Sequence, residues 1–254
     1  MQKTNTNKTA LIIFLEDKNR EQVQSQFSDA IDSHDVDALY RAFLTDTIVA
    51  CLNAGSYEVI ICYAPGKSKK LLDQVIKSLI EVLRGKNKER LENAEGWLWQ
   101  QDRHNSSQDM QEAVDRCFDM GYPAVVVIDC VTPTISKQML QNANQVLEKK
   151  DIVFGPTLEG SFYLFGMRKK LPQLFEKIDW SDRDSIYSKM VEVASTDELD
   201  WEELELWYNL RQPGDIEFLA RDINAFRLAG DERTAKHTEK VLDALIQKFQ
   251  SEEV

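Results

Sequence analysis

The segment PAVVVIDCVTPTISKQMLQNANQVLEKKDIVFGPTLEGSFYLFGM, residues 123–167, predicts the fold of the chain. Small and β-branched apolar residues fill positions 124–128 and are followed by Asp129, a pattern typical of a strand buried on both faces of a parallel sheet. Apolar residues then recur every three or four positions over 136–150, which predicts an amphipathic helix. This strand and helix are the first half of a βαβ unit.

The second half of the segment predicts another strand and then a β-hairpin. Thr132 and Thr134 are placed to cap the helix. After the helix, residues 151–154 are apolar, residues 155–160 are rich in turn-forming types, and residues 161–165 form an aromatic strand. Because ligands in open α/β sheets sit at the carboxyl ends of strands, the loops after these strands are expected to carry the chemistry.

The rest of the chain alternates between strand and helix patterns. Strands are expected at 9–15, 57–64 and 97–100, and helices from a cap at Ser33 or Asp35 to Gly55, over 67–84, and from Ser106 or Ser107 to Gly121. The polar runs 16–29 and 85–95 lack a helical period and are predicted to be loops, the first long enough to cover a site. This order predicts an α/β fold with three α/β/α layers around a mostly parallel sheet, in one domain over residues 1–254.

The C-terminal part adds helices and one edge strand. Helices are expected at 171–178, 183–194, 215–228 and 231–249, and an edge strand at 203–210. The last helix, within the C-terminal segment 231–254, is apolar on one face and could pack either on the domain or on a second subunit. At the other end of the chain, residues 1–8 are polar and are expected to form a disordered tail.

The composition argues against several classes of partner. The chain carries 31 Lys and Arg against 43 Asp and Glu, a net charge of −12, so no basic face for nucleic acid or anionic lipid is expected. No apolar run approaches the roughly 20 residues of a membrane span, and the N-terminus lacks the apolar core of a signal peptide. The four cysteines form no C-x-x-C pair and are expected to be buried, reduced thiols. A cytoplasmic location is therefore predicted.

Several segments resemble a known family of bacterial transferases. Residues 151–167, DIVFGPTLEGSFYLFGM, resemble its signature VxGPxxDGGYyLiG, and residues 37–47, DALYRAFLTDT, are similar to its helix aaLYraFllDt. Trp180 and Ser181 match its ipWst motif, and residues 206–215 lie where it has wyDVDtpeD. The family is that of GT-A-like, radical-SAM- and selenodomain-associated glycosyltransferases. The resemblance implies a nucleotide-diphospho-sugar transferase fold, which also serves nucleotidyltransferases.

The resemblance also implies where a site would lie. In GT-A enzymes, carboxylates after the central strand hold a divalent metal that bridges the nucleotide's phosphates. If the chain is active, the implied cofactor is Mg²⁺ or Mn²⁺ with a nucleotide sugar, and the implied catalytic residues are Asp129 and Glu159. The implied binding residues are Phe14, Glu16, Thr132, Gly160, Ser161, Trp180, Ser181 and Asn209.

The chain departs from the family at the positions that bind metal and phosphate. Val131 stands at the metal-site Asp and cannot ligate a cation, and Glu16, Gln24 and Gln26 replace basic residues of the N-terminal loop. A diphosphate site needs such groups because desolvating several negative charges is costly. The implied function is a nucleotide-sugar-handling transferase whose activity is lost or weakened. The alternative is a non-catalytic binding or assembly module on the same scaffold, which could form a homodimer.

Purely structural roles for the same residues stay open. Asp129 could be a strand-end residue that caps the following loop, and Glu159 could be a solvated turn residue. Conversely, Asp129, Glu159 and Asp215 could assemble a shifted metal site, although no metal ligand is assigned. The tryptophans are of a type that usually packs in a core or an interface, and Trp180 is the one that falls in a family motif.

Overall fold

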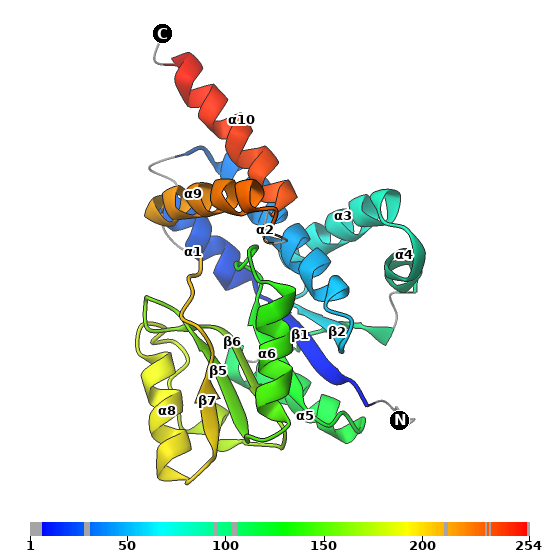
Figure 1. Cartoon of the computed structure of the whole chain (residues 1–254), viewed down its shortest axis with the longest axis vertical. Helices are drawn as coiled ribbons and strands as arrows, with labels where there is room; N and C mark the ends of the chain where they lie inside the picture. Colours follow the sequence, from blue (N-terminus) through cyan, green and yellow to red (C-terminus); the bar gives the residue numbers. More distant parts are fainter. Residues whose placement is uncertain are drawn as a thin grey trace.

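The chain folds around a mixed sheet of seven strands (Figure 1). The computed structural model describes residues 7–27, 31–93, 96–102, 106–210, 213–231, 233 and 235–252. Its strands are β1 (Thr9–Leu15), β2 (Tyr57–Tyr63), β3 (Leu98–Gln100), β4 (Val125–Asp129), β5 (Ile152–Pro156), β6 (Phe162–Met167) and β7 (Trp201–Glu203). They lie in the order β3-β2-β1-β4-β6-β5-β7. The predicted α/β class is confirmed.

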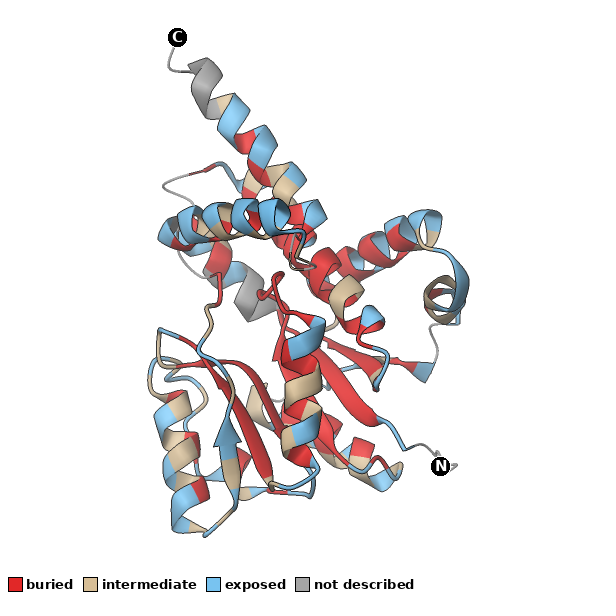
Figure 2. Cartoon of the chain, in the orientation of Figure 1, coloured by how far each residue is buried: buried red, intermediate tan, exposed pale blue. Residues whose placement is uncertain are grey.

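Helices cover both faces of this sheet. They are α1 (Asp17–Phe27), α2 (Ser33–Asn53), α3 (Lys67–Val82), α4 (Gly85–Glu92), α5 (Ser106–Asp119), α6 (Lys137–Leu147), α7 (Gln173–Glu176), α8 (Ile186–Thr196), α9 (Pro213–Ala229) and α10 (Lys236–Glu252). Alternate residues of β1 contribute to two separate apolar cores, one shared with α2, α3 and α6 and the other with α5, α7 and α8. Figure 2 shows the buried strands between the more exposed helices, which is the predicted three-layer arrangement.

The hairpin predicted after the βαβ unit folds back into the centre of the sheet. β6 runs antiparallel to both β4 and β5 and separates them, with Val127 and Phe154 on either side of Phe165. Strands β1, β2, β3 and β4 are parallel to one another, and β5 and β7 are parallel to each other. The carboxyl ends of β1 and β4 therefore lie side by side at one edge of the sheet, where ligands of open α/β sheets bind.

Two segments that were predicted to be loops are helices. The run 16–29 contains α1, whose Val23 and Phe27 are one helical turn apart and are buried against the core. The run 85–95 contains α4, which buries only Leu91. The prediction was wrong because each helix has too few apolar residues to give a period, so tertiary packing and not sequence pattern stabilises it.

The predicted helix caps were also misplaced. Asp32 caps α2, since its carboxylate accepts hydrogen bonds from the backbone N–H groups of His34 and Asp35 at 3.0 Å each. Ser136 caps α6 through a bond of 3.0 Å from the backbone N–H of Met139. Thr132 and Thr134, which were expected to cap α6, lie in the preceding loop and do not cap the helix.

The C-terminal region differs from the prediction mainly at its strand. β7 covers only residues 201–203, and the next stretch makes a single bridge between Thr157 and Trp207 instead of a continuous edge strand. α10 packs against α2 and buries Leu242 and Leu245, so its apolar face is covered by the chain itself in this part. Residues 1–6 of the predicted tail lie outside the described residues.

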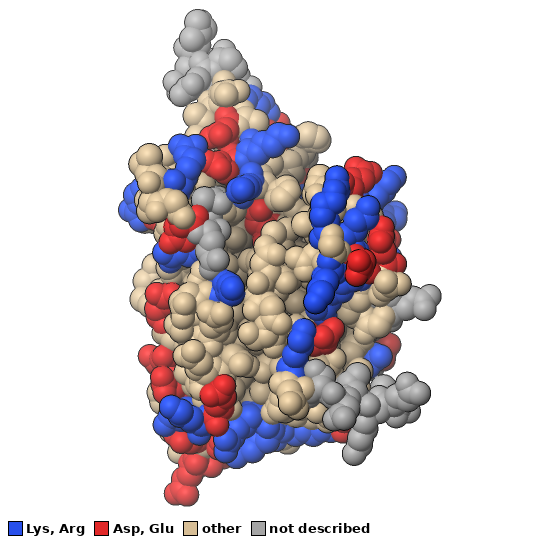
Figure 3. Space-filling model, turned by 45° about the vertical axis from the view of Figure 1, so that its right-hand side comes forward, with Lys and Arg blue, Asp and Glu red and all other residues tan. Residues whose placement is uncertain are grey.

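Basic side chains gather on one part of the surface (Figure 3), and the four cysteines are buried. Figure 3 shows Lys and Arg side chains gathered over α3 and α4, where acidic side chains are interspersed, as in the Lys88–Glu92 pair at 3.8 Å. The four cysteines are buried free thiols, and burial raises the pKa of Cys117 to about 12. Within the described part of the chain, no helix is long and apolar enough to cross a membrane.

Candidate functional site

A pocket opens at the carboxyl ends of β1 and β4, where the sheet topology predicts a site. Half of the predicted site residues line it, namely Phe14, Glu16, Asp129, Ser161 and Trp180. Glu16 directly follows β1, Asp129 ends β4, and Ser161 precedes β6. The residues that were chosen from the ends of these strands therefore meet at one pocket.

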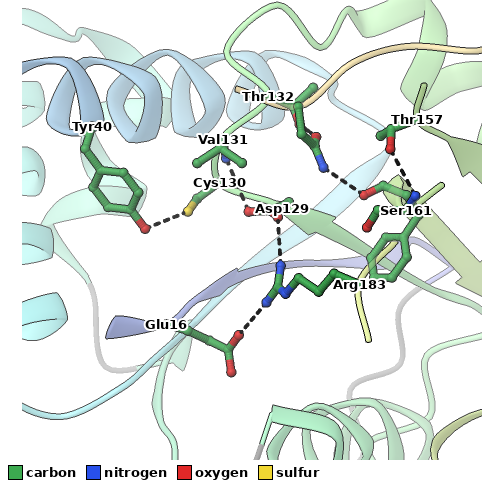
Figure 4. Close-up of polar contacts among 11 residues, drawn as sticks. Glu16, Tyr40, Asp129, Cys130, Val131, Thr132, Thr157, Ser161 and Arg183 are labelled. Carbon is green, nitrogen blue, oxygen red and sulfur yellow. Dashed lines mark hydrogen bonds and ion pairs between the residues drawn. The ribbon is translucent and has the colours of Figure 1, made fainter. Parts of the chain in front are cut away.

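Arg183, which the sequence interpretation missed, is the cation among the described residues that line this pocket (Figure 4). Its Nη2 lies 3.3 Å from Oε2 of Glu16, and its Nη1 lies 3.8 Å from Oδ2 of Asp129. Glu16 is only 7% exposed and Asp129 only 8%. Buried carboxylates need such a partner because an uncompensated charge is costly away from water. Both acidic residues of the pocket are therefore paired with one guanidinium group.

The loop that carries Arg183 is fixed by hydrogen bonds of its own. The carboxylate of Asp179 accepts bonds from the backbone N–H and the hydroxyl of Ser181, at 3.0 and 2.6 Å, which lower the pKa of Asp179. Asp182 pairs with Lys189 at 2.8 Å, and this pair lowers the pKa of Asp182. Ser181, a predicted binding residue, is thus exposed and holds the loop instead of lining the pocket.

Gly160 holds the same loop against the hairpin. Its φ of +80° lies in the left-handed region, and a Cβ at this position would collide with the carbonyl oxygen of Asp184. The carbonyl of Gly160 also accepts a hydrogen bond of 3.1 Å from the backbone N–H of Tyr187. Gly160 was predicted to bind a ligand, but its observed contacts bring the Arg183 loop close to the turn between β5 and β6.

Trp180 packs one face of its ring against the core and also lines the pocket. Its ring stacks on Phe175 with centroids 5.6 Å apart and planes at 8°, and it meets Phe162 edge-on at 5.9 Å. Its indole N–H donates to the carbonyl of Leu174 at 3.2 Å. These contacts fix the ring, so a ligand in the pocket would meet a rigid aromatic wall.

Thr132 and Asn209, both predicted to bind a ligand, instead form an internal clamp. The hydroxyl of Thr132 donates to Oδ1 of Asn209 at 2.8 Å, and Nδ2 of Asn209 donates to the carbonyl of Phe162 at 3.0 Å. Both side chains are fully buried and neither lines the pocket. The clamp ties the segment after β7 to the β4–α6 loop and to β6, and so supports the pocket from behind.

We expect Asn209→Ala to lower the free energy of unfolding by about 2–3 kcal/mol, because it leaves two buried groups without their hydrogen-bond partner. The measurement is urea denaturation followed by circular dichroism. Asn224→Ala, an exposed change on α9, is the control and should stay within about 0.5 kcal/mol of wild type. Equal midpoints for Asn209→Ala and the control would contradict the role of the clamp.

Glu159, the second predicted catalytic residue, does not line this pocket. It lies in the turn between β5 and β6, and its Oε2 is buried without a hydrogen-bond partner among the described residues. Among those residues, the one group of three metal-ligand side chains close enough to share an ion is Asp32, His34 and Asp35. A site shared by Asp129, Glu159 and Asp215 is thus not formed.

The Asp32 cluster is itself exposed and already paired. Lys248 reaches Oδ2 of Asp32 at 2.6 Å and Oδ2 of Asp35 at 2.8 Å, and its bond to Asp32, together with the bond from the backbone N–H of Asp35, lowers the pKa of Asp32 to about 2. Lys248 comes from α10, so the cluster joins α10 to the start of α2. Its chemistry is that of a surface ion-pair network.

Val131, at the position aligned with the family's metal ligand, points away from the pocket. Its side chain is 2% exposed and belongs to the core shared with α2 and α6. Its backbone N–H donates to Oδ1 of Asp129 at 3.4 Å, which orients that carboxylate (Figure 4). The loop therefore contributes backbone, not a side-chain ligand, next to Asp129.

Comparison with protein families matches residues 47–182, just over half of the chain, to the family described as "Uncharacterized protein conserved in bacteria (DUF2064)". None of the curated proteins matches the chain.

Solved structures share the fold over most of the chain. A protein from Desulfovibrio desulfuricans G20, provisionally named a nucleotide-diphospho-sugar transferase, has 22% identity and a TM-score of 0.73, covering 96% of this chain and 99% of its own. A cytidylyltransferase from Leptospira borgpetersenii has 12% identity and a TM-score of 0.56, covering 97% and 96%. The 4-diphosphocytidyl-2C-methyl-D-erythritol synthase from Anaerococcus prevotii has 13% identity and a TM-score of 0.51, covering 84% and 94%. The predicted nucleotide-diphospho-sugar transferase fold is confirmed.

Proposed function

The chain belongs to the bacterial DUF2064 family, and from this premise we propose that it handles a nucleotide or nucleotide sugar in the pocket beside Asp129 and that its metal-dependent transfer is lost or weakened. Within that proposal, Asp129 is the acidic residue that a ligand would meet and Trp180 is the wall on which a base or sugar would stack. The proposal also includes the narrower assignment as a glycosyltransferase. In it, Glu159 is a catalytic residue of any transfer activity that remains.

The position and lining of the pocket support the binding part of the proposal. It lies at the carboxyl edge of the sheet, where this class of fold binds its ligands. Phe14, Phe162 and Trp180 give it apolar walls, and Ser161 adds a polar group among them. Apolar walls with a few placed polar groups are typical of small-molecule sites.

The charge of the pocket supports the loss of transfer. Phosphoryl and glycosyl transfer from a nucleotide require positive charge at the phosphates. Here the cation Arg183 is paired with Glu16 and Asp129, and Val131 supplies no ligand. This arrangement of two carboxylates around one guanidinium is the observation that carries the proposal.

Calorimetric titration with UDP, GDP, CTP and UDP-glucose, each with and without Mg²⁺ or Mn²⁺, tests the proposal. We expect saturable binding of at least one nucleotide or nucleotide sugar, which Trp180→Leu weakens and which the metal does not strengthen. Trp201→Leu, at a half-buried tryptophan on β7, is the matched control. Flat titrations across all ligands would refute nucleotide handling, and metal-stimulated turnover would refute the loss of transfer.

The binding or assembly module is the second candidate, and the Arg183 pairing favours it as well. A site whose charges are satisfied internally needs no ligand to neutralise them. This candidate includes a homodimer, for which light scattering after gel filtration is the direct measurement. A monomer that turns over a nucleotide sugar would exclude it.

A further inference from the structure

The described residues around the pocket do not fit a divalent metal ion, although the fold family implies one. Mg²⁺ and Mn²⁺ take oxygen ligands in near-octahedral geometry, which needs several carboxylate, carbonyl or water oxygens around one point. Glu16 and Asp129 offer carboxylates, but the guanidinium of Arg183 contacts both of them. The side chain at position 131 is apolar and turned into the core.

We propose that Arg183 is the built-in cation of this site and takes the place of a divalent ion as the counter-charge of Glu16 and Asp129. The fold family implies a divalent ion that the residues of this pocket do not fit. On this proposal, the guanidinium of Arg183 has replaced that ion. The proposal concerns this chain's own ion pairs and does not depend on whether a nucleotide binds.

The geometry suits a guanidinium better than any other side chain. Its planar group offers five donors and stays charged at every physiological pH, so one Arg can face two carboxylates at once. The contacts at 3.3 and 3.8 Å involve different nitrogens of Arg183, one for each carboxylate (Figure 4). Arg183 is itself largely buried, with 26% of its side chain exposed, which limits the screening of these pairs by water.

Arg183 is also held in position before any ligand arrives. Its loop is fixed on one side by the bonds of Asp179 to Ser181 and on the other by the pair between Asp182 and Lys189. Gly160 allows the loop to approach the hairpin closely. A cation fixed in this way cannot be exchanged as a dissolved ion can, so the site keeps its positive charge at any metal concentration.

Arg183 and a metal ion exclude each other. A divalent ion bound to the same carboxylate oxygens would lie next to the guanidinium. The positive charges of the ion and of Arg183 would then repel each other strongly. Removing the guanidinium would leave two buried carboxylates facing one space, which is the start of a cation site. The proposal therefore predicts that a single substitution converts a metal-free site into a metal-binding one.

The test is Mn²⁺ binding to the full chain, measured by electron paramagnetic resonance and by the Mn²⁺-dependent shift of the melting temperature. We expect Arg183→Ala to bind Mn²⁺ at least tenfold more tightly than wild type, and its melting temperature to rise with Mn²⁺ because a ligand of the native state stabilises it. Arg183→Lys keeps the charge and should not gain Mn²⁺. Arg227→Ala, which removes an arginine from an exposed pair with Glu239, is the control.

Two further results decide the assignment. Adding Asp129→Asn to Arg183→Ala should abolish the gained affinity, which locates the ion at this pair. If Arg183→Ala does not fold, Arg183→Gln, which is similar in length, serves in the same measurement. Tight Mn²⁺ binding by wild type, or no gain in either folded variant, would overturn the proposal. Because no nucleotide is present, neither outcome bears on nucleotide binding.

Discussion

Replacing Asp46 with alanine is expected to lower the free energy of unfolding by about 2–4 kcal/mol, since it removes a buried carboxylate that accepts hydrogen bonds from a helix in a distant part of the chain. Asp46 lies on α2 and is 6% exposed. Its oxygens accept hydrogen bonds from the backbone N–H of His237 at 3.2 Å and from the backbone N–H and hydroxyl of Thr238 at 2.8 Å each. The ring Nδ1 of His237 lies 2.8 Å from the same carboxylate.

These groups are the first N–H donors of α10, which have no partner within their own helix. Asp46 therefore does for α10 what a local cap does for other helices, and its negative charge also faces the positive end of the helix dipole. Without the carboxylate, the hydroxyl and N–H of the fully buried Thr238 lose their acceptor. The change should loosen α10 first, because α2 keeps its other contacts with the sheet.

Guanidinium denaturation gives the change in stability, and limited proteolysis shows where the chain opens. Asp73→Ala is the matched control, because Asp73 is an exposed helical aspartate paired with a lysine one turn away, and the effect should stay within about 0.5 kcal/mol. Asp46→Asn should lose less stability than Asp46→Ala and more than Asp73→Ala, since its amide keeps one acceptor oxygen. A midpoint for Asp46→Ala equal to that of the control would show that the anchor adds no stability.

The sequence predicted the buried central strands of this fold well and its polar helices badly, for one physical reason. β1 and β4 are buried on both faces, so they appear as uninterrupted apolar runs that no exposed element would have. α1 has few apolar residues in its sequence and α4 buries only Leu91, so both sequences resemble solvated loops. What makes them helical is contact with neighbouring elements, and a single sequence does not contain that information.

The candidate site divides in the same way. Glu16 and Asp129 were predictable because a residue that follows a parallel strand must lie at the ligand-binding edge. Arg183 was not, because its partner Glu16 is 167 positions away in the sequence. Its signal in the sequence is weak, a basic residue between Asp182 and Asp184 just after the Trp180 motif. Thr132 and Asn209 were predicted to bind a ligand, but both are buried and hydrogen-bonded to each other, a property that their position in the sequence does not reveal.

Gly160→Ala is expected to lower the free energy of unfolding by at least about 3 kcal/mol and to displace the loop that carries Arg183. Two effects add here. The φ of +80° disfavours any residue with a Cβ by about 1 kcal/mol, and the new methyl group would meet the backbone oxygen of Asp184, which cannot rotate away as a flexible side chain can. The loop or the hairpin must therefore move, and Arg183 and Trp180 move with the loop.

Gly55→Ala separates the two effects. Gly55 has a similar φ of +69°, but no atom lies within 4 Å of a Cβ built there, so it should show the conformational cost alone. The difference between the two variants in urea denaturation measures the collision with Asp184. In folded Gly160→Ala, the tryptophan fluorescence should also change, because displacing the loop would alter the stacking of Trp180 on Phe175. Equal losses for both glycines, with unchanged fluorescence, would mean that the hairpin does not position Arg183, and the preorganisation of the built-in cation would then have to come from the bonds within its own loop.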